Sequence, residues 1–233
     1  MPNWVYNSVS IYGNASDIAK LKSQLNQPFT VKHTNFNVET GKFEEKLTNY
    51  TNPVFAFWNI VKPTDMDAYY GPQPEVDLTK PITFSSDHWY DWNVRNWGTK
   101  WDVAVSEDEK YPETELMEEN ANNLIYRFNT AWSYPEPAVM KLAEQYPDLT
   151  FNLDYEEETG WGGEIEYRLG DRHVLQDYDS KCRDCDANDT LEYCEDCENE
   201  VCSACGYGNE EAEENKCQTH MLQSDPTQQK ENA

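Results

Sequence analysis

Apolar and polar side chains alternate at the start of the chain, which predicts a half-buried strand. One side of this strand carries Val5, Asn7, Val9 and Ile11. Gly13-Asn14 then predicts a turn. Ser16 or Asp17 can cap a helix that ends at Pro28 and has an apolar face of Ile18, Leu21 and Leu25. The chain is therefore expected to open with a strand, a turn and a helix.

The clearest periodic pattern lies between residues 124 and 169. Alternation predicts a strand at Leu124, Tyr126 and Phe128, and Pro137 begins a helix that Pro147 stops. Two more strands follow, with inward positions at Leu149, Phe151, Leu153 and Tyr155, then at Ile165, Tyr167 and Leu169. Together with the opening strand and helix, this order predicts an α+β fold. We expect a ferredoxin-like antiparallel sheet with helices on one face.

The segment between these patterned regions is harder to interpret. Residues 29–52 are polar and weakly patterned, so we expect loops with at most a short helix. The apolar run 55–61 predicts a strand ended by Pro63. A helix is predicted from Trp89 to Trp97 and ends at Gly98. A short strand is predicted over 101–105, and a turn is predicted at 120–122.

All seven cysteines lie in the C-terminal third, in pairs separated by two residues. With one histidine they form four pairs: Cys182/Cys185, Cys194/Cys197, Cys202/Cys205 and Cys217/His220. Seven thiols cannot all pair as disulfides, whereas seven thiols and one imidazole supply the eight ligands of two tetrahedral zinc ions. A disulfide framework or a redox dithiol is the alternative. We expect two structural Zn²⁺ ions, which would supply the folding free energy of so small a segment.

The spacing of the four pairs resembles that of cross-brace zinc modules such as RING and FYVE domains. This resemblance implies one site of Cys182, Cys185, Cys202 and Cys205, and another of Cys194, Cys197, Cys217 and His220. The sequential alternative joins the first pair with the second and the third with the fourth. A hairpin is expected over residues 198–201. FYVE domains carry a basic phosphate-binding run, whereas residues 186–193 of this chain include three acidic residues and no basic one, so lipid binding is not implied.

Acidic residues dominate the composition. The chain has 44 acidic and 18 basic residues, which gives a formal net charge of −26. Direct nucleic-acid binding is not expected, because that affinity depends on cationic side chains that replace phosphate counterions. A membrane surface is disfavoured for the same reason, and no apolar run approaches the roughly 20 residues that span a bilayer. We expect a cytoplasmic protein, in which the acidity serves solubility or imitates nucleic-acid phosphate.

An ordered series of short motifs resembles a known family. The series runs from 1–7 through 57–63, 89–92, 96–102 and 128–135 to 155–158. It is similar to the YubB-type ferredoxin-like family, small proteins of unknown function carried by bacteriophages and conjugative plasmids. The resemblance covers nearly all of residues 1–170 and implies a bacterial host cytoplasm. It does not extend to the cysteine-rich segment.

Tryptophan is concentrated in the middle of the chain. Trp89, Trp92, Trp97, Trp101 and Trp132 are expected mainly as core residues. The alternative is an aromatic ligand pocket formed by Trp92, Asn96, Trp97, Lys100, Asp102, Thr130 and Trp132. His88 lies beside Asp87 and Asp91, but no nucleophile is paired with it. The sequence therefore gives no positive support for an enzyme.

These observations predict three segments: a ferredoxin-like domain over 1–170, a binuclear zinc module over 178–222 and a flexible tail over 223–233. The function that we expect is non-catalytic contact with a host protein during phage or plasmid life. One alternative is an acidic DNA mimic that inhibits a DNA-binding defence protein. The other is a small-ligand or nucleotide pocket in the Trp-rich region.

Overall fold

The computed structural model describes residues 2–38, 40–72, 79, 83–106, 114–179, 191–194 and 199–206. The chain divides into two compact units. The first consists of Met1–Tyr155 and Glu164–Leu175, and the second of Glu156–Gly163 and Gln176–Ala233. Each unit is described separately below.

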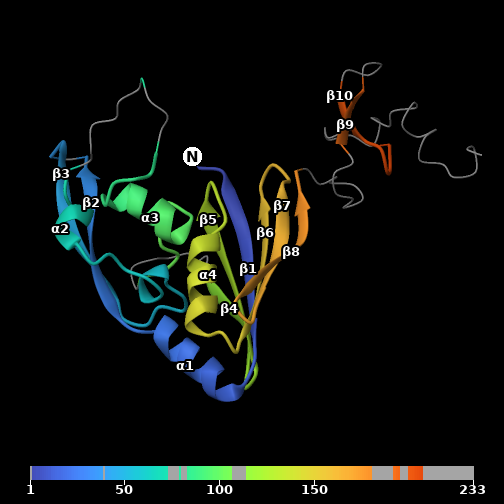
Figure 1. Ribbon diagram of the computed structural model, residues 1–233. Coiled ribbons are helices and arrows are strands. Elements are labelled where there is room, and N and C mark those ends of the chain that lie inside the picture. Colours follow the sequence, from blue (N-terminus) through green and yellow to red (C-terminus); the bar gives the residue numbers. More distant parts are fainter. Residues whose placement is uncertain are drawn as a thin grey trace, which may run out of the picture. The chain divides into compact units, whose positions relative to one another are not determined.

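The first unit is built on the six elements of a ferredoxin-like βαββαβ fold (Figure 1). These are β1 (Trp4–Tyr12), α1 (Ala15–Leu25), β4 (Glu115–Asn120), β5 (Asn123–Ala131), α4 (Glu136–Gln145) and β6 (Thr150–Glu157). Their strands are ordered β4-β5-β1-β6 within a six-stranded sheet. Strand β5 pairs antiparallel with both β1 and β4, so β4 runs parallel to β1. The predicted α+β, ferredoxin-like fold is confirmed.

Two more strands extend the sheet beyond β6, in the order β6-β7-β8. Strand β7 covers Gly162–Arg168 and β8 covers Asp171–Tyr178. Ile165 and Tyr167 are buried as predicted, but Leu169 is 75% exposed. The inward placement of Leu169 was wrong because the chain turns there: Leu169 and Gly170 both adopt positive φ values. Strand β8 was not predicted, since nearly all of its residues are exposed and give no apolar alternation.

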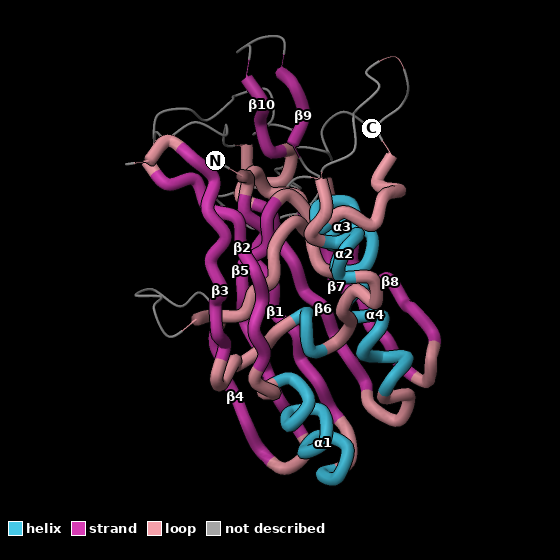
Figure 2. The backbone as a smooth tube through the Cα atoms, turned by 90° about the vertical axis from the view of Figure 1, so that its left-hand side faces the viewer, coloured by secondary structure: helices cyan, strands magenta, loops and turns pink. Residues whose placement is uncertain are grey.

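A long insertion separates α1 from β4. It contains β2 (Phe29–Asn37), β3 (Lys42–Tyr50), the 3-10 turn η1 (Phe57–Asn59), α2 (Met66–Tyr69) and α3 (Trp89–Trp97). The β2–β3 hairpin lies toward the viewer in Figure 2. The prediction of loops over 29–52 was wrong because the two strands pair with each other, through contacts such as Lys32–Glu45 at 2.8 Å. Such a two-stranded, largely exposed ribbon leaves little apolar pattern in the sequence.

Two predicted strands of the insertion are absent from the described secondary structure. Residues 55–61 contain the 3-10 turn Phe57–Asn59 and no strand, because the N–H groups of Phe57 and Trp58 donate to the side chain of Asp102 instead of to a neighbouring strand. Residues 101–105 are irregular. The predicted helix Trp89–Trp97 is confirmed, and Gly98 ends it with φ 84°. A Cβ at Gly98 would lie 2.5 Å from the Pro137 ring, so glycine also permits the close approach of α4.

The core of the first unit lies between the sheet and its helices. The inward residues of β1, β5 and β6 meet the apolar faces of α1 and α4. Aromatic rings fill the space beside the insertion: Phe55 lies 5.0 Å from Phe128, and Phe57 lies 6.0 Å from Trp97, between ring centroids. Burial of these large side chains stabilises the insertion against the sheet, at roughly 25 cal/mol for each Å² removed from water.

The described part of the second unit includes a short antiparallel hairpin, β9 (Leu191–Cys194) with β10 (Asn199–Cys202). In its register Cys194 faces Asn199 and Cys202 faces Leu191. The strands therefore flank residues 195–198, whereas the predicted hairpin lay over 198–201. In the part of the chain that the structure describes, no helix is long and apolar enough to cross a membrane.

Candidate functional site

Two of the predicted pocket tryptophans belong to the core. Trp92 and Trp97 are buried and meet edge to face, with ring centroids 5.6 Å apart. The Trp97 indole Nε1 donates to the carbonyl of Val61 at 3.0 Å, so its polar atom is used internally. Asn96 donates to the Trp92 carbonyl one helical turn earlier. These three side chains hold the insertion together.

Asp102 has a structural role as an acceptor of backbone hydrogen bonds. Its two carboxylate oxygens accept the N–H groups of Phe57, Trp58 and Ala104 at 2.9, 2.8 and 3.1 Å. Burial raises the pKa of Asp102, while these hydrogen bonds favour the charged form and oppose the rise. The carboxylate ties η1 to the segment that follows α3, and so fixes the chain on both sides of the aromatic core.

Thr130 anchors the end of β5 from within. Its hydroxyl receives the Asn7 side-chain amide at 2.9 Å and donates to the carbonyl of Ser133 at 2.7 Å. Next to it, the Thr99 hydroxyl bonds both backbone groups of Ala131, at 3.1 and 3.2 Å. The Ser133 hydroxyl donates to the carbonyl of Gly98. The loop after α3 is thereby fastened to the loop after β5, with one tryptophan on each.

These two loops present a pair of exposed indoles. Trp101 and Trp132 stack with ring centroids 6.2 Å apart and are 42% and 45% exposed. Trp4, at the start of β1, lies 6.4 Å from Trp101. The Lys100 ammonium lies over both exposed rings, 4.5 Å from the Trp101 centroid and 4.8 Å from that of Trp132. We call Trp4, Trp101, Trp132 and Lys100 the tryptophan platform.

The backbone at Trp132 is unusual. Its φ is 68°, in the left-handed region that costs a residue with a Cβ roughly 1–2 kcal/mol. The conformation is held by the Trp132 N–H, which donates to the carbonyl of Asn3 at 2.9 Å, and by the hydrogen bonds around Thr130. A large exposed aromatic side chain therefore occupies a position where glycine would fit more easily.

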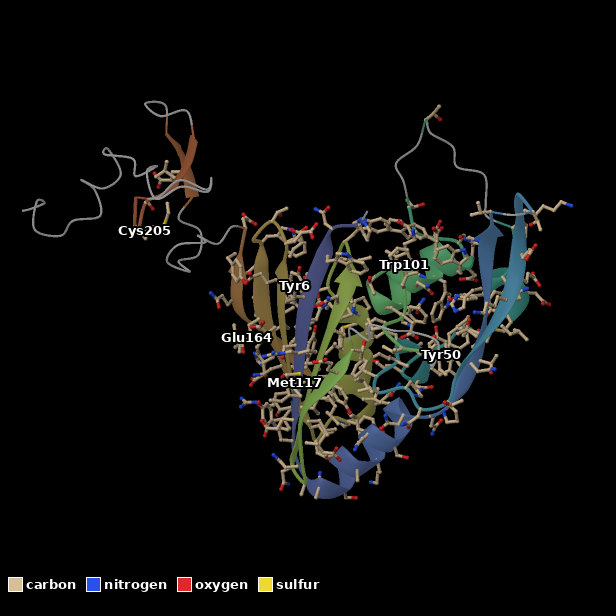
Figure 3. The ribbon with its side chains drawn as sticks, turned by 180° about the vertical axis from the view of Figure 1, so that it is seen from behind. Tyr6, Tyr50, Trp101, Met117, Glu164 and Cys205 are labelled. Atoms are coloured by element: carbon tan, nitrogen blue, oxygen red, sulfur yellow. The ribbon has the colours of Figure 1, made fainter. Side chains whose placement is uncertain are left out.

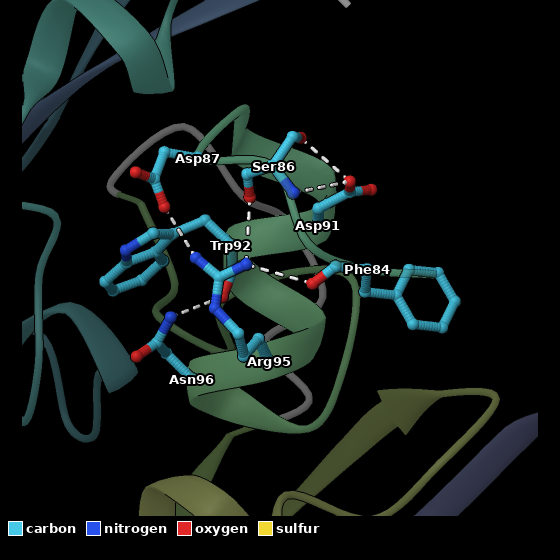
Figure 4. A network of polar contacts seen from close by, with 7 residues as sticks. All are labelled: Phe84, Ser86, Asp87, Asp91, Trp92, Arg95 and Asn96. Carbon is cyan, nitrogen blue, oxygen red and sulfur yellow. Dashed lines mark hydrogen bonds and ion pairs between the residues drawn. The ribbon is translucent and has the colours of Figure 1, made fainter. Parts of the chain in front are cut away.

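Helix α3 is secured at its start by a polar network (Figure 4). Arg95 donates to the carbonyls of Phe84 and Ser86, both at 2.9 Å, and pairs with Asp87 at 2.6 Å. Asp91 accepts the Ser86 N–H and hydroxyl at 3.2 and 2.8 Å. Asp87 and Asp91 therefore fix the conformation of the segment before α3.

The seven predicted pocket residues thus fall into two sets, one in or beside the core and one on the surface. Those in the core or supporting it are Trp92, Asn96, Trp97, Asp102 and Thr130, while Lys100 and Trp132 are on the surface. The sequence did not indicate that Trp101 would lie between Trp4 and Trp132. Contacts between residues so far apart along the chain leave no local pattern in the sequence. A cleft of about 730 Å³ lies elsewhere, between α1 and β4, where Lys22 and Glu119 pair at 2.5 Å.

The cysteine-rich segment is described only in part. Cys182, Cys185, Cys197, Cys217 and His220 lie outside the described residues, and Cys194 is described only by its place in β9. Cys202 is buried at the end of β10, and Cys205 follows in a tight turn. The Gly206 N–H closes this turn on the Cys202 carbonyl at 2.8 Å, with φ 76° at Gly206. Among the described residues, no group of three or more metal-binding side chains is found.

The described cysteine turn has a form that suits a metal. Cys-x-x-Cys is a ligand spacing typical of structural zinc sites, and here a left-handed glycine closes the turn. The hairpin register separates Cys194 from Cys202 by three residues along the strands, or about 10 Å.

Comparison with family models agrees with the fold of residues 100–198. Residues 100–198 match a family model described as the ferredoxin-like domain in Api92-like protein. This match includes the strands β4 to β8 and helix α4. A similar solved structure is the crystal structure of the protein api92 from Yersinia pseudotuberculosis, with 9% identity and a TM-score of 0.44, covering 78% of this chain and 100% of that chain. No curated protein matches the chain. The family match identifies a ferredoxin-like domain over residues 100–198.

Proposed function

We propose that this protein is a non-catalytic interaction protein that binds a partner protein through the tryptophan platform. The observation that carries the proposal is the exposed, stacked pair of Trp101 and Trp132, with Trp132 held in a strained backbone conformation. Tryptophan is enriched among the few residues that contribute most of the energy of protein interfaces. A rigid pair loses little conformational entropy on binding, because hydrogen bonds within the fold already fix its position.

The surrounding chemistry favours binding over catalysis. Lys100 is held over the indole faces, and the nearby Asp102 carboxylate accepts backbone hydrogen bonds. His88, the residue considered for acid–base chemistry, is buried, and burial lowers its pKa. The resemblance of the motif series to the YubB-type family supports a setting in which a phage or plasmid accessory protein meets a protein of its bacterial host.

The test compares capture of host proteins by three forms of the full chain. The first is the wild type, the second carries Trp101→Ala and Trp132→Ala, and the third carries Met140→Ala. Met140 is a matched control, since it is 43% exposed on α4 and does not belong to the platform. We expect at least one host protein to be retained by the wild type and the control and lost by the double variant. Equal retention by all three forms would contradict the proposal.

We further propose that the cysteine-rich segment binds two structural zinc ions in a cross-brace. The ligands would be Cys182, Cys185, Cys202 and Cys205 for one ion, and Cys194, Cys197, Cys217 and His220 for the other. The proposal is supported by the complete set of eight donors and by the turn at Cys202–Gly206. Zinc would stabilise a small segment that cannot bury a sufficient core by itself. Four protein ligands for each ion leave no open coordination position for catalysis.

Native mass spectrometry of reduced protein tests this second proposal. We expect the mass of two zinc ions in the wild type and of one in a Cys202→Ser variant, because each ion would be held by its own four ligands. A Ser203→Ala variant in the same turn should keep both ions. A wild type that carries no zinc after purification without chelator would refute the proposal.

A further inference from the structure

The sheet of the first unit has two unlike faces. Helices α1 and α4 cover one face (Figure 1), whereas no helix among the described residues of this unit packs on the other. Seen from behind in Figure 3, this open face presents Tyr6 from β1, Met117 from β4 and Glu164 from β7. Tyr6 is 52% exposed and Met117 is 47% exposed. Exposed apolar and aromatic side chains on an uncovered sheet face indicate an interaction surface.

Strand register identifies the charged residues of the open face. Residues directly opposite each other on paired strands point to the same side. Glu115 is opposite Arg127, and Glu118 is opposite Ile125, while the buried Tyr126 between them points to the helices. On β6 and β7 the buried residues alternate with Asp154, Glu164 and Glu166. The carboxylates of the open face therefore include Glu115, Glu118, Asp154, Glu164 and Glu166.

The two faces differ in how their carboxylates are compensated. On the helical side, Lys20 pairs with Asp17 at 2.8 Å and Lys141 with Glu144 at 2.6 Å. On the open face, Glu118 accepts the neutral amides of Asn120 and Asn123, and Glu164 accepts that of Asn152. Arg127 and Arg168 are the cations on the described strands of this face, and Arg168 lies 3.8 Å from Glu166. The open face keeps a net negative charge.

We infer that the open face of the sheet docks a cationic protein surface, rich in lysine and arginine. The inference rests on the proposed function and names the chemistry of its partner. The open face is continuous with the tryptophan platform, because Trp4 and Tyr6 project from the same side of β1 and Trp4 contacts Trp101. Aromatic anchors at one end of the surface would supply binding energy, and the carboxylates would attract and orient a positively charged partner.

Charge argues against the other occupants of this face. A symmetric dimer through it would place the same carboxylates of two copies against each other. The C-terminal part of this chain is also acidic, with 17 acidic and 5 basic residues from Asp171 onward, so 5 − 17 = −12. Nucleic acid would be repelled for the same reason. A cationic protein is the partner class that this surface attracts.

The test uses two variants of equal net charge and a defined probe. The face variant carries Glu115→Gln, Glu118→Gln, Glu164→Gln and Glu166→Gln. The control variant removes four carboxylates from other surfaces: Glu45→Gln, Asp67→Asn, Glu144→Gln and Asp148→Asn. The probe is a fluorescent lysine-rich peptide of about 15 residues with one tryptophan, and binding is followed by anisotropy at about 50 mM salt, where surface charges are weakly screened.

We expect the face variant to bind the peptide about 10-fold more weakly than the wild type and the control variant less than about 3-fold more weakly. Equal weakening in both variants would show attraction by total charge alone and would overturn the inference, as would no binding by the wild type. Host-protein capture by the Trp101→Ala, Trp132→Ala variant reports separately on the proposed function. Loss of the host protein in that variant, with unchanged peptide binding by the face and control variants, would uphold the proposed function and overturn this inference.

Discussion

Tryptophans only a few residues apart in the sequence have opposite roles in the first unit. Trp92 and Trp97 are buried on α3, and the Trp97 indole N–H is bonded to a backbone carbonyl. Trp101 follows only four residues later and is stacked on Trp132 at the surface. The difference shows that a Trp-rich stretch can stabilise a fold with one part and present a binding surface with the next. Stability and binding should therefore respond to different substitutions.

The largest effect on stability is expected at Trp97. A Trp97→Ala substitution leaves a cavity beside Phe57 and Trp58 and removes the hydrogen bond to Val61, so the free energy of unfolding should fall by about 3–5 kcal/mol. Urea denaturation followed by circular dichroism measures this loss. A change below about 1 kcal/mol would mean that the insertion does not depend on this ring.

Substitution of Asp102 should give the next largest effect on stability, because its carboxylate ties η1 to the segment that follows α3. An Asp102→Ala substitution leaves three backbone N–H groups without their acceptor, and we expect a loss of roughly 2–4 kcal/mol. Asp102→Asn keeps one acceptor oxygen, so its free energy of unfolding should fall by less. The same denaturation experiment compares the two variants. Equal stability of wild type and Asp102→Ala would rule out the bridging role.

Trp132 should show the opposite behaviour. In a Trp132→Gly variant, relief of the left-handed strain offsets the lost stacking with Trp101, so stability should stay within about 1 kcal/mol of the wild type. Binding of the captured host protein should nevertheless be lost. A variant that unfolds like Trp97→Ala would place Trp132 in the same structural group and remove the contrast.

The smallest effect concerns pH. His88 precedes α3, and burial lowers its pKa below the ordinary value of about 6.5. The unfolded chain then binds this proton more readily than the folded one, so stability is present above about pH 6.5 and declines as the pH falls through that value. Denaturation of wild type and His88→Gln at pH 7.5 and 5.5, on either side of about 6.5, measures how far the free energy of unfolding falls in each protein. A decline of equal size in both proteins would assign it to other groups.

Periodic segments made the core of the fold predictable. Strands β1, β5, β6 and β7 and helices α1, α3 and α4 were all indicated by alternation or helical spacing, because each buries one face. The exposed strands β2, β3, β4 and β8 escaped prediction, since their stability comes from pairing with a neighbour and not from a buried side. The apolar run at 55–61 was wrongly assigned to a strand, because a short apolar run does not distinguish a strand from a buried turn.

The candidate sites divide in the same way. The ligand set for two zinc ions follows from the spacing of cysteines in the sequence, and it stays a prediction. The tryptophan platform could not be predicted, because Trp4, Trp101 and Trp132 are distant in sequence and meet only where the ends of β1 and β5 adjoin the loop after α3.

The sequence by itself determined the α+β class, most of the strands and helices of the ferredoxin-like order, and the acidic character of the chain, since these depend on local pattern and composition. The tertiary structure alone decided which tryptophans are buried, which backbone position is strained and which sheet face carries more carboxylates than cations. Those features arise from strand pairing and from contacts between distant loops, and such contacts leave no local periodicity in the sequence.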